Sequence, residues 1–303
     1  MNNLDLGVKI GQLELKNPLI TASGTFGFGK EYGQYYDIHS LGAMTTKGIT
    51  LQPREGNPPP RIVETSAGII NSVGLENPGI NAFIREEIPH LQKLKVPVMI
   101  NISGNKIEDY ALLAQKLGKY DIDALEVNVS CPNVKQGGMN FGTQPQSVYE
   151  ITKTVRENWD KTLIIKLTPN VTNIGEIALA AQEAKADALS LINTVVAMDI
   201  DIHRQRAVLG NRIGGLSGPA ILPIALAMVY QVAQQVDIPL IGMGGILSGE
   251  DALKFLLAGA SAVAIGTANF INPLSPLNIL EEIEDYMRTN GYQSLREIIG
   301  QLK

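Results

Sequence analysis

Short apolar runs alternate with longer amphipathic stretches along the whole chain. Eight runs have the length and composition of buried strands, at residues 18–23, 43–47, 96–104, 123–130, 163–169, 187–194, 238–245 and 261–268. Between several of them, apolar residues recur with a helical period, at residues 107–120, 145–159, 173–186, 219–236 and 248–260. This alternation predicts an α/β protein, a (β/α)8 TIM barrel that forms one domain over residues 1–303.

Two segments are too long to be simple connections, residues 48–80 and 195–218. Each follows the carboxyl end of an expected strand, which is the end of a barrel where active sites are built. We therefore expect both segments to border a functional site.

Polar residues occupy alternate positions in the third, fourth and fifth expected strands: Asn101 and Ser103, then Glu126, Asn128 and Ser130, then Lys166 and Thr168. A period of two places each set on one face of its strand, and here that face should point into the barrel. An unpaired amide or ammonium group is costly to bury, so the pattern predicts a bound polar ligand. A polar network that satisfies itself is the alternative.

Glycine-rich turns follow the seventh and eighth expected strands, and they contribute Gly244, Gly245, Gly266 and Thr267. In this fold the loops after those two strands often bind phosphate through backbone N–H groups. Glycines that serve only tight turns are the alternative. Lys47 and Lys166, each at or near a strand end, could be surface residues individually, but together they favour an anionic ligand.

The composition narrows the choice of ligand and compartment. The 303 residues carry a net charge of -5 with no basic cluster, which disfavours nucleic-acid binding. One cysteine and three scattered histidines exclude a disulfide framework and predict no metal site. No apolar run is long enough to span a membrane and no signal peptide is evident, so we expect a soluble, cytoplasmic protein. Without a G-x-G-x-x-G motif, a mononucleotide-sized cofactor fits better than a dinucleotide.

Seven motifs, in order along nearly the whole chain, resemble those of the class 1 dihydroorotate dehydrogenases: GIINSVGLENPG, EVNVSCPN, KLTPN, INTVVAMDID, GGLSGPA, GMGGI and AIGTA. The most specific are the asparagine-rich NSVGL and the SCPN loop. Members of this family are FMN-dependent barrel enzymes that oxidise dihydroorotate to orotate in pyrimidine biosynthesis. The resemblance implies the same fold, reaction and cofactor here.

The resemblance also implies which residues form the site. FMN would contact Ser23, Lys47, Gly48, Asn101, Asn128, Lys166, Ile192, Gly218, Gly244, Gly245, Gly266 and Thr267. Dihydroorotate would be held by Lys47, Asn71, Ser72, Val73, Gly74, Leu75, Asn128, Asn133, Asn193 and Thr194. Amide side chains suit a planar pyrimidine that carries hydrogen-bonding groups on several edges.

Three catalytic residues follow from the same resemblance. Cys131 would be the base that takes the C5 proton while hydride leaves C6 for the flavin. A free thiol has a pKa of about 8.5, so the site would have to favour the thiolate. Lys166 would stabilise the negative charge of reduced flavin, and Lys47 would contact both flavin and substrate. Residues 132–142 would form a mobile loop, with glycines that allow closure over the substrate.

Within class 1, residues 193–201 followed by residues 210–232 resemble subclass 1B. In that subclass a catalytic homodimer joins two subunits carrying FAD and a 2Fe–2S cluster, and the heterotetramer reduces NAD⁺. One cysteine and no dinucleotide motif cannot house that relay, so a partner subunit would be required. The fumarate-dependent subclass 1A is the near alternative.

Three other functions stay open at this point. One is the pyrimidine-reducing subunit of a related FMN-dependent dihydropyrimidine dehydrogenase. Another is a flavin-free aldolase or isomerase that uses Lys166 as a Schiff-base amine. The third is a barrel that binds a ligand or a partner without catalysis, with Cys131 as a small buried apolar residue.

Overall fold

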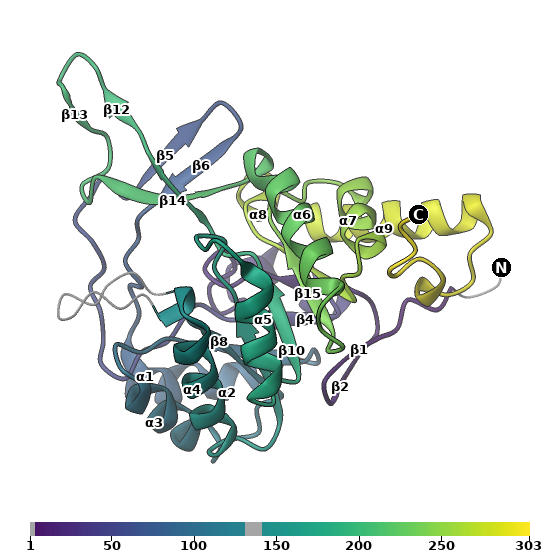
Figure 1. Ribbon diagram of the computed structural model, residues 1–303, viewed down its shortest axis with the longest axis horizontal. Coiled ribbons are helices and arrows are strands. Elements are labelled where there is room, and N and C mark those ends of the chain that lie inside the picture. Colours follow the sequence, from purple (N-terminus) through teal and green to yellow (C-terminus); the bar gives the residue numbers. More distant parts are fainter. Residues whose placement is uncertain (1–3, 131–140) are drawn as a thin grey trace.

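The computed structural model describes residues 4–130 and 141–303, and its centre is a closed barrel of eight parallel strands (Figure 1). In chain order the barrel strands are β3 (Leu19–Thr21), β4 (Ala43–Thr45), β7 (Val98–Ile102), β8 (Ala124–Asn128), β9 (Thr162–Lys166), β10 (Ala188–Leu191), β15 (Leu240–Met243) and β16 (Ala262–Ile265). Pairing of β16 with β3 closes the barrel. Seven of the eight predicted apolar runs contain one of these strands, and β9 begins one residue before its predicted run, so the predicted fold class is confirmed.

Helices surround the barrel: α1 (Gly79–Glu86), α2 (Ile88–Leu91), α3 (Ile107–Leu117), α4 (Pro145–Arg156), α5 (Ile174–Glu183), α6 (Leu222–Ala233), α7 (Gly249–Leu257), α8 (Ala268–Ile271) and α9 (Ser275–Asn290). The five predicted helical ranges contain α3 to α7. Capping residues set two of the starts, since Asn173 and Ser248 each accept a backbone N–H from the first turn of α5 and α7. Strand residues that face the helices, such as Val127 and Ile165, are fully buried.

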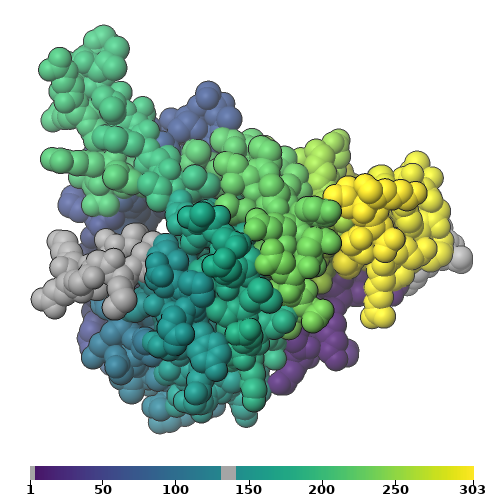
Figure 2. Space-filling view, viewed as in Figure 1, coloured from purple at the N-terminus to yellow at the C-terminus, as the bar shows by residue number. Residues whose placement is uncertain are grey.

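The two long segments form one sheet rather than two separate loops. Its strands are β5 (Ile62–Thr65) and β6 (Gly68–Asn71) from the first segment, and β11 (Val195–Met198) and β14 (Ile213–Ser217) from the second. They pair antiparallel in the order β11-β14-β6-β5. A hairpin of β12 (Ile200–Asp201) and β13 (Arg206–Ala207) extends from it. Figures 1 and 2 show these strands projecting from the barrel.

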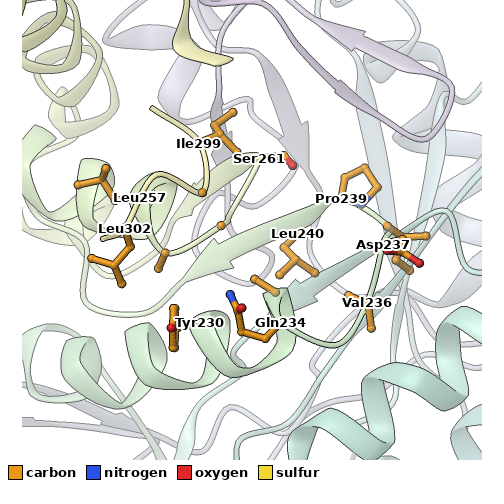
Figure 3. Close-up of a pocket in the computed structure, with 15 residues that line it drawn as sticks. Tyr230, Gln234, Val236, Asp237, Pro239, Leu240, Leu257, Ser261, Ile299 and Leu302 are labelled. Carbon is orange, nitrogen blue, oxygen red and sulfur yellow. The ribbon is translucent and has the colours of Figure 1, made fainter. Parts of the chain in front are cut away.

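The opposite end of the barrel carries another hairpin, β1 (Val8–Ile10) and β2 (Leu13–Leu15). The backbone N–H of Gln12, in its turn, donates to Thr162 Oγ1 at the start of β9, at 2.9 Å. A cavity of about 460 Å³ also lies at this end, where Leu240 begins β15 and Ser261 precedes β16 (Figure 3). This cavity is therefore at the other end of the strands from the predicted site.

Candidate active site

A buried cluster of polar side chains crosses the interior of the barrel between four neighbouring strands. Glu126 of β8 accepts hydrogen bonds from Asn101 Nδ2 of β7, at 2.6 Å, and from Ser190 Oγ of β10, at 2.8 Å. Lys166 Nζ, at the end of β9, lies 3.9 Å from Glu126 Oε2. Glu126 is 2% exposed and Lys166 is 4% exposed. The strand register aligns Asn101 with Glu126 and Ser190 with Lys166.

Lys166 points into the barrel, as its position in the strand pattern predicts. Its ammonium also donates to Ser23 Oγ, which follows β3, at 3.1 Å. The ion pair with Glu126 means that the buried charge of Lys166 already has a partner within the chain. The layer of Asn101, Glu126, Lys166 and Ser190 is therefore a polar network that satisfies itself, which was the alternative to a bound ligand. The burial of Lys166 alone does not indicate a ligand.

A second set of amides lies one level nearer the carboxyl ends of the strands. Asn128, the last residue of β8, accepts at Oδ1 from the backbone of Ser130 at 3.0 Å and from Asn193 Nδ2 at 3.3 Å. Asn193 Oδ1 in turn accepts from the backbone N–H of Thr194 at 2.8 Å. These side chains are only half-buried. The structure thus brings together three of the residues predicted to hold substrate.

The NSVGL segment lies against the same region. A Cβ placed on Gly48 would be 2.8 Å from Asn101 Oδ1 and 3.6 Å from a methyl group of Leu75. Gly48 therefore allows the backbone after β4 to approach Asn101, with Leu75 alongside. Asn71 Nδ2 donates to the carbonyl oxygen of Gly215 on β14, at 3.3 Å, so the sheet formed by the two long segments holds this stretch in place.

The two glycine turns adjoin, as predicted. A Cβ on Gly245 would lie 2.8 Å from the carbonyl oxygen of Gly218, and one on Gly218 would lie 3.5 Å from Thr267 Cγ2. Thr267 Oγ1 also donates to Ser217 Oγ at 3.0 Å. Gly218 and Gly245 both have positive φ, at 95° and 76°, which favours glycine. The turns after β15 and β16 therefore lie beside Gly218, which precedes α6, and the three segments together form one rim of the barrel.

This rim fits a phosphate group. Within residues 4–130 and 141–303, no acceptor is assigned to the backbone N–H groups of Gly245, Gly266 and Thr267, and all three residues are half-buried. A Cβ on Gly266 would make only ordinary contacts, the nearest at 3.5 Å, so nearby side chains do not crowd that turn. Open N–H donors at adjacent glycine turns are the chemistry of an anion site.

Some of the remaining predicted site residues lie within the described part of the chain and others lie outside it. Ile192 is buried after β10, with its N–H donating to Met243 of β15, and the other turn residue, Gly244, is half-buried. Ser72, Val73 and Gly74 join β6 to Leu75, while Lys47 is half-buried after β4. Cys131, Asn133 and most of the predicted mobile loop lie outside the described residues.

Ser190 and Ser217 belong to this region but were not predicted as site residues. Glu126 was predicted to point into the barrel, but no function was predicted for it. Ser190 carries the same signal as its neighbours, a polar side chain at an alternate position of a buried strand. Ser217 carries no such signal, because its contact with Thr267 depends on how β14 is placed over the barrel.

In the part of the chain that the structure describes, no helix is long and apolar enough to cross a membrane. The same residues contain no group of three or more metal-ligating side chains arranged to hold an ion.

Comparison with known proteins places the whole barrel in one family. The family model described as dihydroorotate dehydrogenase matches residues 5–287. Among similar proteins, three named "Dihydroorotate dehydrogenase B (NAD(+)), catalytic subunit" come from Thermoanaerobacter pseudethanolicus, Alkaliphilus oremlandii and Geotalea uraniireducens. They are 56%, 54% and 53% identical to this chain, over at least 99% of both sequences in each pair. This chain belongs to the dihydroorotate dehydrogenase family.

Proposed function

We propose that this chain is the catalytic subunit of an NAD⁺-reducing dihydroorotate dehydrogenase, which oxidises dihydroorotate to orotate for pyrimidine biosynthesis with FMN as cofactor. The observation that carries the proposal is the rim of the barrel, where Lys166, the amides of Asn128 and Asn193, and two open glycine turns lie together. Family membership and the shared name of the relatives support the reaction and the acceptor. A flavin-free aldolase or a non-catalytic barrel agrees neither with the family nor with the shared name of the relatives.

FMN supplies the hydride acceptor of the reaction when it is bound. The backbone N–H groups of Gly245, Gly266 and Thr267 would bind its phosphate, with Gly244 and Gly218 completing the turns. Lys166, fixed between Ser23 and Glu126, would place a positive charge beside the ring system and stabilise the charge that reduction adds. The remaining predicted contacts with FMN would be made by Ser23, Lys47, Gly48, Asn101, Asn128 and Ile192.

The substrate would bind among the half-buried amides at the same rim. Asn128 and Asn193 hold each other by a hydrogen bond, which limits the orientations that their free donors and acceptors can take. Asn71, tied to β14, and the stretch to Leu75 would cover another edge of the pyrimidine. Lys47 would offer an ammonium group to the carboxylate of dihydroorotate.

Oxidation of the C5–C6 bond requires a proton acceptor on C5 as hydride leaves C6. We assign that role to Cys131, which comes three positions after Asn128, the last residue of β8, in the sequence. Its thiolate would take the C5 proton and release it to solvent after the product leaves. Asn133, two residues on, would contact the substrate from the same loop.

An anaerobic titration tests the proposal directly. The purified chain should carry FMN, which acid extraction and chromatography identify, and stoichiometric dihydroorotate should bleach its visible absorbance with formation of one orotate per flavin. Protein without flavin, or flavin that dihydroorotate leaves oxidised, contradicts the proposal. The flavin of a dihydropyrimidine dehydrogenase subunit would instead be reduced by 5,6-dihydrouracil, which then becomes uracil.

The choice of acceptor separates the two subclasses of the family. In subclass 1B a partner subunit with FAD and a 2Fe–2S cluster carries electrons onward, and the expected assembly is a catalytic homodimer flanked by two such subunits. Reduced chain mixed with fumarate should then stay reduced, whereas addition of the partner should restore oxidation by NAD⁺. Rapid reoxidation by fumarate alone would place the chain in subclass 1A.

A further inference from the structure

We propose that Glu126 is a positioning residue for the reaction: its negative charge orients Lys166 and Asn101 and lowers the reduction potential of the bound flavin. This inference rests on the proposed function, because it concerns the same site. It assigns a role to a buried carboxylate that the proposed chemistry does not itself use.

The contacts of Glu126 are those of a fixed anion rather than of a packing residue. Its Oε1 accepts from Ser190 and its Oε2 accepts from Asn101 at 2.6 Å, while Lys166 Nζ lies 3.9 Å from Oε2. The side chain is almost completely buried between β7, β9 and β10. Burial of a carboxylate costs desolvation free energy, and apolar residues could fill a barrel interior without that cost. The presence of Glu126 here therefore points to a role for its charge.

The carboxylate decides which way its amide neighbour faces. An ionised Glu126 only accepts hydrogen bonds, so Asn101 must turn its Nδ2 toward it. Asn101 Oδ1 then faces Gly48, at the side of the barrel mouth where the cofactor is proposed to lie. A neutral amide at position 126 could donate as well as accept, and this preference would be lost.

The same charge balances Lys166. Alone, the ammonium would favour an anionic reduced flavin strongly, which would hold electrons on the cofactor. With Glu126 beside it, the buried cluster has no net charge, and the stabilisation of reduced flavin is smaller. Electrons would then pass more readily from the flavin to an external acceptor.

The test compares Glu126→Gln with Glu281→Gln. The first removes the buried charge while keeping the shape, and the second makes the same change in net charge at an exposed position of α9. Both flavin-loaded proteins are titrated anaerobically against a reference dye to obtain the midpoint potential. We expect Glu126→Gln to raise the ratio of reduced to oxidised flavin at a given potential about tenfold, an upward shift of roughly 30 mV for two electrons. Glu281→Gln should match the unaltered protein.

A third variant, Glu126→Asp, separates charge from packing and provides a measurement if Glu126→Gln does not retain flavin. Aspartate keeps the charge but is shorter, so a charge role predicts a smaller rise than with glutamine. A packing role predicts that the isosteric glutamine is the milder change. An unchanged or lowered potential in Glu126→Gln, or a larger rise in Glu126→Asp, overturns the inference. Failure of dihydroorotate to reduce the unaltered protein would instead count against the proposed function.

Discussion

The ammonium group of Lys166 shows how one buried charge is held at the mouth of a barrel. Its alternation with apolar neighbours places it inside, and the structure confirms this, together with the inward positions of Asn101 and Glu126. The partners of each side chain cannot be obtained from the pattern of one strand, because they depend on the register between neighbouring strands. For that reason the sequence identified these residues but not the ion pair.

At the residue scale, replacement of Cys131 by serine tests the proposed base. A hydroxyl is far less acidic than a thiol, so proton removal from C5 should become slow. We expect turnover with dihydroorotate to fall about 10²- to 10⁴-fold at neutral pH, while the flavin absorbance and the affinity for orotate change little. Stopped-flow measurement of flavin reduction checks this. Reduction at the original rate would show that another group takes the proton.

Tyr36 offers a test of stability at high pH. Burial, and then the neighbouring Tyr32, raise the pKa of Tyr36 well above its ordinary value of 10.0. Its stabilising contribution is therefore complete below about pH 10 and is lost as the pH rises toward the folded-state pKa, because only the unfolded chain ionises freely there. Its buried hydroxyl has no hydrogen-bond partner among the described residues, so Tyr36→Phe keeps the ring and removes only the ionisation.

We expect Tyr36→Phe to have equal or slightly greater stability at neutral pH, and a flatter loss of unfolding free energy between about pH 9 and 11. Urea unfolding across that range measures both. Tyr35→Phe, at a side chain 63% exposed, is the matched control. If unfolding free energy falls equally steeply with rising pH in both variants, ionisation of Tyr36 is not the cause of the alkaline loss of stability.

At the scale of elements, the sequence predicted each barrel strand and the helices α3 to α7, because their apolar runs are strongly periodic, but not α9, the longest helix. The sheet of β5, β6, β11 and β14 was not predicted. Its strands are short and half-exposed, and the pairing of β6 with β14 joins segments far apart in sequence. The two glycine turns were placed together correctly because barrel topology itself brings the ends of β15 and β16 side by side.

Gly218 is the residue by which the turns and the sheet are joined, so Gly218→Ala tests this arrangement. The backbone there has φ of 95° and ψ of −167°, and a Cβ would lie 2.8 Å from the Cα of Gly68. We expect a loss of about 1–3 kcal/mol in unfolding free energy and weaker flavin binding. Gly291→Ala is the control, since φ is 77° there but nothing lies near the added methyl group. Equal flavin affinity in both variants would contradict a role of Gly218 in the cofactor site.

At the scale of the whole molecule, the family and fold are established over nearly the full chain, while the single domain, the dimer and the cytoplasmic location stay predictions. These depend on surfaces and partners that hydrophobic periodicity does not encode. Most residues of the predicted site lie within the described part of the chain, whereas Cys131, the proposed base, and Asn133 lie outside it.

The isolated chain should therefore carry out half of the overall reaction. Dihydroorotate should reduce its flavin within seconds, whereas NAD⁺ should reoxidise it at least about a hundredfold more slowly than the complete assembly does, because the chain contains no dinucleotide-binding motif. Absorbance at 340 nm and flavin absorbance, followed together, measure the two halves separately. Fast NADH formation by the chain alone would mean that no relay subunit is needed.

The hydrogen bond between Asn71 and Gly215 also bears on how the chain folds during synthesis, since these residues are 144 positions apart. As the ribosome releases the chain, the β5–β6 hairpin emerges with one of its edges bare, and β14 arrives only after most of the barrel strands have been made. Until then that edge could pair with another nascent chain. The sheet beside the proposed substrate site is consequently completed late in synthesis, and a translation product that ends before β14 would lack it.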